Sequence, residues 1–147
     1  MENNVIVSIR GRQDLGDGQN ESIELVTEGR LAQGDQGYTL SYQESELTGL
    51  EGTQTTFQIE DGRVTLLREG EFNSQMVFEQ GRRHLSMYNT PYGALAVGIN
   101  TRKMKVELAG LEGRIEITYA IEIDHAVAGE NCFKIDVKRR GPDGLRQ

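Results

Sequence analysis

Apolar and polar residues alternate along most of the chain, which is the pattern of half-buried β-strands. Between positions 115 and 123, for example, isoleucine or tyrosine occupies every second position. Comparable alternation has its apolar positions at Val5, Val7, Ile9, Ile23, Leu25, Tyr38, Leu40, Tyr42, Phe57, Ile59, Val64, Leu66, Met76, Phe78, Leu85, Met87, Leu95, Val97, Ile99, Met104, Val106, Leu108, Phe133, Ile135 and Val137. No window combines a period near 3.6 with helix caps, so we expect any helix to be a single turn.

Glycine-containing turn signals separate the predicted strands. They are Gly16-Asp17-Gly18, the stretch 34–37, Asp61-Gly62, Glu69-Gly70, Gln80-Gly81 and Pro91-Tyr92-Gly93. Such short connections join antiparallel neighbours. About ten of them favour an all-β, up-and-down meander, and closing it into a single antiparallel barrel of about eight to ten strands removes exposed sheet edges. A flattened sandwich is the competing architecture.

Composition narrows the class of protein. The 147 residues are expected to form a single domain over 1–147. A net charge of -7 repels phosphate backbones and anionic lipid, so nucleic acid and membrane surfaces are disfavoured as partners. The lone Cys132 suits a reducing compartment, and neither a signal pattern nor a run of about 18 apolar residues is present. We therefore expect a cytoplasmic protein.

Several polar residues fall on the side of each strand that should face the barrel interior. We take the more apolar alternate set of each strand as the inward one. The polar residues that share it are Tyr42, Glu44, Thr55, Arg68, Ser74, Asn89, Thr101, Tyr119 and Asn131. If successive strands run alternately up and down, Glu44, Thr55, Arg68, Ser74 and Asn89 gather at one end of the barrel, with Tyr42 beside them on the strand that leads to Glu44. The sequence therefore predicts a ligand-binding mouth lined by Tyr42, Glu44, Thr55, Arg68 and Asn89.

Glu44 and Arg68 are the two charged residues in this set, and they say most about its role. An inward charge costs several kcal/mol unless it is paired, and a bidentate contact between guanidinium and carboxylate is the usual remedy. Two interpretations stay open. The pair is either a structural plug of one barrel end, or a binding site in which Arg68 offers donors to a ligand carboxylate or phosphate while Glu44 orients it.

The sequence offers few residues for a metal site, a catalytic nucleophile or a phosphate-binding loop. His84, His125 and Cys132 are too few for a zinc site based on cysteine and histidine, and a pairing of Cys132 with His125 lacks a legible orienting partner. No strand-loop-helix unit surrounds a glycine-rich loop, which excludes a phosphate loop. The basic clusters Arg82-Arg83 and 138–147 are more simply solvated strand ends and a terminus. We predict no catalytic residue, no metal site and no cofactor.

A family resemblance adds to this picture. The segments "YQES" with Glu44, "LLREG" with Arg68, "MVFEQG" and "YNTPYG" lie in a stretch, 37–101, that resembles the YwiB-like family of bacterial proteins, a domain of unknown function. The similarity extends over nearly the whole chain. That family is itself similar to the calycins, the lipocalin-like barrels, which implies closure of the barrel and a small, mostly apolar ligand. No enzymatic motif comes with the resemblance, and a fold does not by itself convey a function.

The prediction is therefore a barrel that binds a small molecule at its mouth without catalysis. The main alternative is a protein-protein interaction or self-association module on an outer sheet face. The residues Ala94, Ala96 and Gly98 are unusually apolar for a solvated face and would form it. A two-fold homodimer is the default in that case. An enzyme of unrecognised type is the third candidate.

Overall fold

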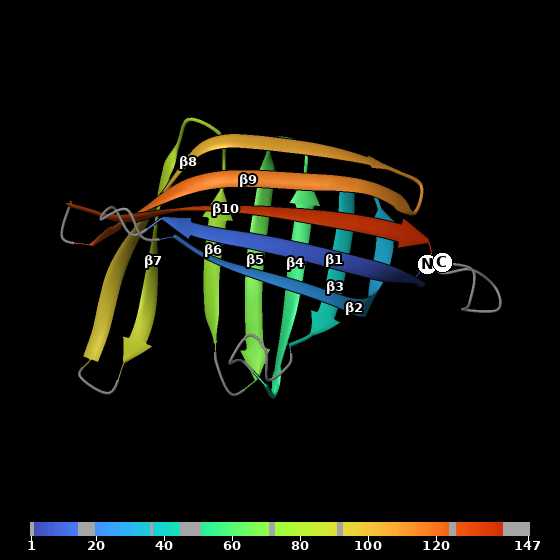
Figure 1. The fold of residues 1–147 in the computed structure, drawn as a ribbon, viewed down its shortest axis with the longest axis horizontal. Helices are drawn as coiled ribbons and strands as arrows, with labels where there is room; N and C mark the ends of the chain where they lie inside the picture. The colour runs from blue at the N-terminus through green and yellow to red at the C-terminus, as the bar shows by residue number, and fades with distance from the viewer. Residues whose placement is uncertain are drawn as a thin grey trace.

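The computed structural model describes residues 2–14, 20–35, 37–44, 51–70, 73–90, 93–123 and 126–139. Within these residues the chain forms ten strands and no helix (Figure 1). The strands are β1 Glu2–Asp14, β2 Asn20–Gly34, β3 Gly37–Gln43, β4 Thr53–Glu60, β5 Arg63–Gly70, β6 Ser74–Phe78, β7 Arg83–Thr90, β8 Gly93–Ala109, β9 Glu112–Ile123 and β10 Ala126–Arg139. The all-β prediction is confirmed.

Strand β4 shows why the alternating pattern gives this fold. Phe57 and Ile59 are buried, as are the threonines of the same parity, whereas Gln54 and Gln58 are exposed. The next strand returns at once, because Glu60 pairs with Arg63 across Asp61-Gly62. Gly62 has a φ of 79°, a conformation that glycine adopts readily and that tight hairpin turns require.

The strands form one antiparallel sheet that curls into a nearly closed barrel. Their order is β6-β5-β4-β3-β2-β1-β10-β9-β8-β7, so each strand pairs with its sequence neighbour except at β6 and β7. The first and last strands pair over the register from Val5↔Arg139 to Asp14↔Glu130. In Figure 1 the long strands β1, β2, β9 and β10 run across the shorter strands β3 to β6. The predicted single up-and-down barrel is confirmed.

Strands β6 and β7 are the two edges of the sheet, and a tight turn joins them at one end. Arg82 N donates to Glu79 O at 3.0 Å, and the turn exchanges two backbone hydrogen bonds with Thr101 of β8, at 3.0 and 3.2 Å. Beside the turn, His84 Nε2 lies 2.7 Å from Glu79 Oε1. The pairing of β8 with β9 shifts register between Thr101 and Lys103, directly after the residue that bonds the turn.

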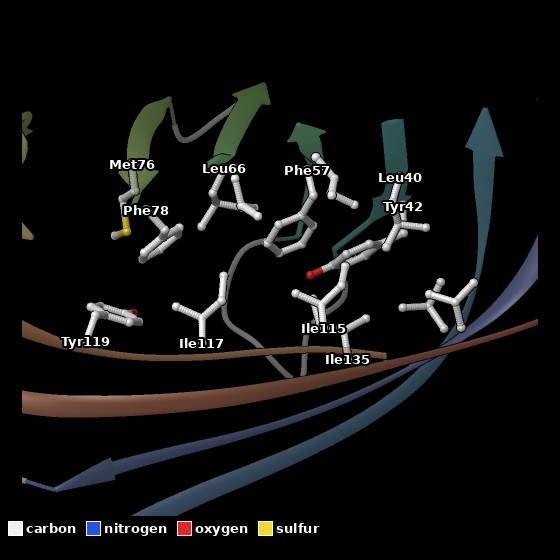
Figure 2. Packing of buried hydrophobic residues seen from close by; sticks show 14 of the residues in the cluster. Leu40, Tyr42, Phe57, Leu66, Met76, Phe78, Ile115, Ile117, Tyr119 and Ile135 are labelled. Atoms are coloured by element: carbon white, nitrogen blue, oxygen red, sulfur yellow. The ribbon is translucent and has the colours of Figure 1, made fainter. Parts of the chain in front are cut away.

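One hydrophobic cluster fills the barrel (Figure 2). Aromatic rings run through it in sequence, with centroid distances of 6.4 Å for Tyr42–Phe57, 5.9 Å for Phe57–Phe133 and 5.7 Å for Phe133–Phe78. Phe78 lies 4.9 Å from Tyr119. This row of rings therefore connects strands from both crossing layers, and it has a tyrosine at each end.

Strand β2 belongs to both layers, and at Gly29 it crosses from one to the other. This residue pairs with Val5 of β1 and with Tyr42 of β3, the first rung of the β2–β3 ladder. A Cβ at this position would lie 2.8 Å from Ser41 O and 2.9 Å from Val7 Cγ2. Glycine thus allows the close backbone approach that places Tyr42 inside the barrel.

Strand β7 departs from the prediction. Leu85 was expected to face inward, yet it is 67% exposed. It pairs with Gly98, which lies on the outer face of β8 between the buried Val97 and Ile99. The hairpin itself is as predicted, since Thr90 pairs with Gly93, although Pro91 and Tyr92 lie outside the described residues.

Candidate functional site

Three of the five predicted mouth residues share one rung of the sheet with Ser74, another residue of the inward polar set. The registers Tyr42↔Thr55, Thr55↔Arg68 and Arg68↔Ser74 place them side by side across β3 to β6. Alternation fixed the face of each residue and the short hairpins fixed the register, so this convergence was predictable. Tyr42 and Thr55 are buried and Ser74 is half-buried.

Glu44 follows β3 directly and points its carboxylate into this rung. Its backbone N donates to Thr53 O at 2.9 Å, and only 2% of its side chain is exposed. The Thr55 hydroxyl donates a short hydrogen bond to Glu44 Oε2. The buried carboxylate is therefore oriented by its cross-strand neighbour.

Arg68 forms the predicted ion pair, but loosely. Its Nε lies 4.0 Å from Glu44 Oε2, too far for a hydrogen bond, and 27% of its side chain is exposed. Nε therefore takes no part in the expected bidentate contact, and the carboxylate oxygen that it faces accepts a hydrogen bond from Thr55. The Nε atom is buried and has no hydrogen-bond partner among the described residues.

Burial and nearby charges shift the pKa values of the two buried tyrosines. Burial, and then the neighbouring Glu44 carboxylate, raise the pKa of Tyr42 above its usual value, while Arg68 lowers it. Burial also raises the pKa of Tyr119, against the opposing influence of Asn131 and Arg68. The two phenols belong to different layers of the barrel, Tyr42 to β3 and Tyr119 to β9.

A second polar group surrounds Tyr119. Its neighbours in register are Thr101 of β8 and Asn131 of β10, and Asn131 Nδ2 donates to the Tyr119 hydroxyl at 3.1 Å. Thr101 Oγ1 and Asn131 Oδ1 are buried without a partner in the described part of the chain. Together with Arg68 Nε they are all the buried side-chain nitrogens and oxygens of the described residues that lack one.

A cavity of about 460 Å³ opens beside this second group. It is lined by Gly11, Arg12, Gln13, Ser22, Ile23, Tyr119, Asn131, Cys132 and Phe133. Its inner wall is aromatic, because the rings of Tyr119 and Phe133 meet edge to face at 6.1 Å. Ile23 is 41% exposed, an unusual degree for an isoleucine of an inward-facing set.

The comparison with the sequence prediction is mixed. Tyr42, Glu44, Thr55 and Arg68 come together, whereas Asn89 pairs in register with Ala94 and its side chain lies outside the described residues. Alternation had marked Thr101, Tyr119 and Asn131 as inward, but not as one group of neighbours. Phe133 carried no polar signal that could have identified it.

Other candidate chemistry is sparse among the described residues. No group of three or more potential metal ligands occurs in them, nor does a helix that could cross a bilayer. Cys132 is a half-buried free thiol and His84 is held by Glu79. His125, predicted to lie near Cys132, falls outside the described ranges.

Comparison with known proteins places the chain in a family. No curated protein matches it in sequence. A solved structure, the ywiB protein from Bacillus subtilis, is similar over 94% of this chain and 92% of its own, with a TM-score of 0.81 and 22% sequence identity. At that identity the likeness speaks for the fold. The model of a family described as a domain of unknown function, DUF1934, matches residues 7–135. The chain therefore belongs to the DUF1934 family, and the predicted YwiB-like resemblance is confirmed.

Proposed function

We propose that this protein binds a small ligand, without catalysis, at the barrel mouth formed by Tyr42, Glu44, Thr55 and Arg68. The observation that carries the proposal is the buried Nε of Arg68, which has no hydrogen-bond partner among the described residues. A buried donor without a partner costs about 1–3 kcal/mol, and a ligand acceptor would recover that cost.

The geometry favours this interpretation over a structural plug. A plug should use the donors of its arginine fully, because an unused donor weakens it. Here Glu44 is nearly inaccessible and accepts a hydrogen bond from Thr55, while the Arg68 side chain is 27% exposed and its Nε lies 4.0 Å away. The carboxylate is thus in a position to hold the guanidinium near the mouth while leaving a donor for another group.

Native mass spectrometry of the protein purified from its own host tests the proposal. We expect a retained small molecule in the wild type, its loss in Arg68→Met, and weakened retention in Arg68→Lys, which keeps the charge but not the planar fork. Arg114→Met is a matched control on the outer face, where Arg114 pairs with Asp136 at 2.7 Å. Equal retention in Arg68→Met and wild type would contradict a binding arginine.

Self-association is a second candidate, supported by an apolar outer surface. Leu85 is 67% exposed, and Ala96, two residues from the Gly98 that pairs with Leu85, is also exposed. Part of the predicted face is covered, because a Cβ on Gly98 would lie 2.8 Å from the Arg83 guanidinium. Sedimentation velocity at micromolar concentration should show a dimer that Leu85→Asp abolishes. A wild-type monomer at all concentrations removes this candidate.

A further inference from the structure

Two strongly exposed apolar side chains lie on one rung of the outer face of the barrel. Leu85 is 67% exposed and Val127 is 60% exposed. The registers Leu85↔Gly98, Gly98↔Glu122 and Glu122↔Val127 run in a line across β7, β8, β9 and β10. Because paired residues of antiparallel strands place their side chains on the same side of the sheet, Leu85 and Val127 flank one continuous surface. In Figure 1 these strands meet at the left end of the barrel.

The middle of this rung carries one charge of each sign. Arg83 Nε lies 2.5 Å from Glu122 Oε1. The guanidinium lies over Gly98, where a Cβ would be only 2.8 Å from it. Glycine therefore leaves room for the ion pair to lie against the sheet between the two apolar side chains. We call Arg83, Leu85, Gly98, Glu122 and Val127 the outer strip.

We propose that two copies of this chain associate face to face through the outer strip, about a two-fold axis that crosses the strip between Gly98 and Glu122. Leu85 of each copy then packs on Val127 of the other, as an isologous contact requires. Arg83 of each copy likewise faces Glu122 of the other. The inference rests on the self-association candidate and adds the location of the interface, its symmetry and the ion pairs across it.

The order of charges along the strip selects this arrangement. Two identical strips can stack about a two-fold axis that runs either along the strip or across it. With the axis along the strip, Arg83 faces Arg83 and Glu122 faces Glu122, and such like charges repel each other. With the axis across the strip, each cation faces an anion and each apolar end faces an apolar end. The strip is therefore complementary to itself in one orientation only.

The charge of the whole chain favours a second copy at this place. The formal charge is -7, so two copies repel each other over most of their surface. Within the strip Arg83 balances Glu122, and the contact adds no net charge. A nucleic acid or an anionic lipid surface would instead need a basic patch, which a neutral strip does not provide. Exposed apolar side chains bordered by polar ones are typical of contacts between proteins.

Mixing two charge-reversed variants tests the contact between copies directly. Arg83→Glu makes both charges of the strip negative, and Glu122→Arg makes both positive. We expect each variant alone to be monomeric in sedimentation velocity at concentrations at which the wild type is a dimer. An equimolar mixture should recover a dimer, which native mass spectrometry identifies as a heterodimer by its mass. Opposite charges then face each other only between different copies, so recovery cannot arise within one chain.

A pair of valine variants tests the apolar part of the strip. Val127→Asp should weaken the dimer more than about tenfold, because a two-fold dimer buries this side chain twice. Val26→Asp is the matched control, since Val26 is 68% exposed on β2 and lies outside the strip. It should leave the dimer unchanged. If a charge-reversed variant fails to fold, the comparison of the two valine variants decides the inference by itself.

Defined results overturn the inference. A charge-reversed variant that dimerises alone, a mixture that stays monomeric, or a dimer that tolerates Val127→Asp as well as Val26→Asp would each do so. A wild-type dimer together with one of these results leaves self-association standing and removes only this interface. A wild-type monomer at every concentration removes both. Ligand binding at the mouth is tested separately by Arg68→Met and is unaffected by either outcome.

Discussion

Replacing Glu44 and Arg68 singly and together tests the electrostatics of the mouth most directly. The variants are Arg68→Met, Glu44→Gln and the doubly apolar pair Glu44→Leu with Arg68→Met. The first leaves a carboxylate that is 98% covered without its counter-ion, and the second leaves an arginine that can turn toward solvent. The third removes both charges and keeps the volume close to that of the wild type.

The magnitudes follow from the separation and the exposure. Two unit charges 4.0 Å apart interact by about 4 kcal/mol at an effective dielectric constant of about 20. Since Arg68 is partly exposed, solvent screening reduces this, and we expect Arg68→Met to lower the unfolding free energy by about 2–3 kcal/mol. Glu44→Gln keeps a hydrogen-bond acceptor for Thr55 and should cost about 1–2 kcal/mol. The double variant should cost less than the sum of the two singles by about 2 kcal/mol.

Urea denaturation followed by far-UV circular dichroism measures these differences, because the chain has no tryptophan. The midpoint should move while the slope stays constant, which shows that stability changed and the folded state did not. Costs that add to within about 0.5 kcal/mol would show that the two side chains are energetically independent. Glu44→Gln costing more than Arg68→Met would refute the idea that the buried carboxylate is the group left stranded.

Three further predictions concern pH and packing. Because burial raises the pKa of Tyr42 above 10.0, its contribution to stability is present below pH 10.0 and is lost as the pH rises further. Tyr42→Phe should therefore flatten the fall in urea midpoint between about pH 10 and 12. The hydrogen bond from His84 holds the pKa of Glu79 below 4.5, so its contribution is present above pH 4.5 and is lost as the pH falls through the lower folded-state value. Glu79→Gln should reduce the acid sensitivity of the midpoint between about pH 4.5 and 3, and an unchanged profile would contradict this. Gly29→Ala should destabilise by about 1–3 kcal/mol, since its Cβ would meet Ser41 O at 2.8 Å, and a neutral result in the same urea assay would mean that the corner of β2 is more yielding than its geometry indicates.

The sequence by itself determined the strands, their faces and most of their partners. Alternation of apolar and polar residues has the period of a strand, and Asp61-Gly62 closes its hairpin with the conformation that glycine favours. Once the face of each strand and the register between strands are set, residues at the same rung of adjacent strands must become neighbours. Tyr42, Thr55 and Arg68 therefore could be placed side by side in advance.

Only the tertiary structure decided what faces this rung across the barrel. Arg68 belongs to β5 and Tyr119 to β9, and the way these strands lie across the barrel from each other depends on how sharply the sheet curls at positions such as Gly29 and on the pairing of β1 with β10. Neither quantity is encoded in a local period. The same holds at β7, where Leu85 is apolar yet faces outward, because pairing with Gly98 of β8 fixes its side of the sheet against its own hydrophobicity. Alternation identifies two faces of a strand, but the strand next to it decides which face is inside.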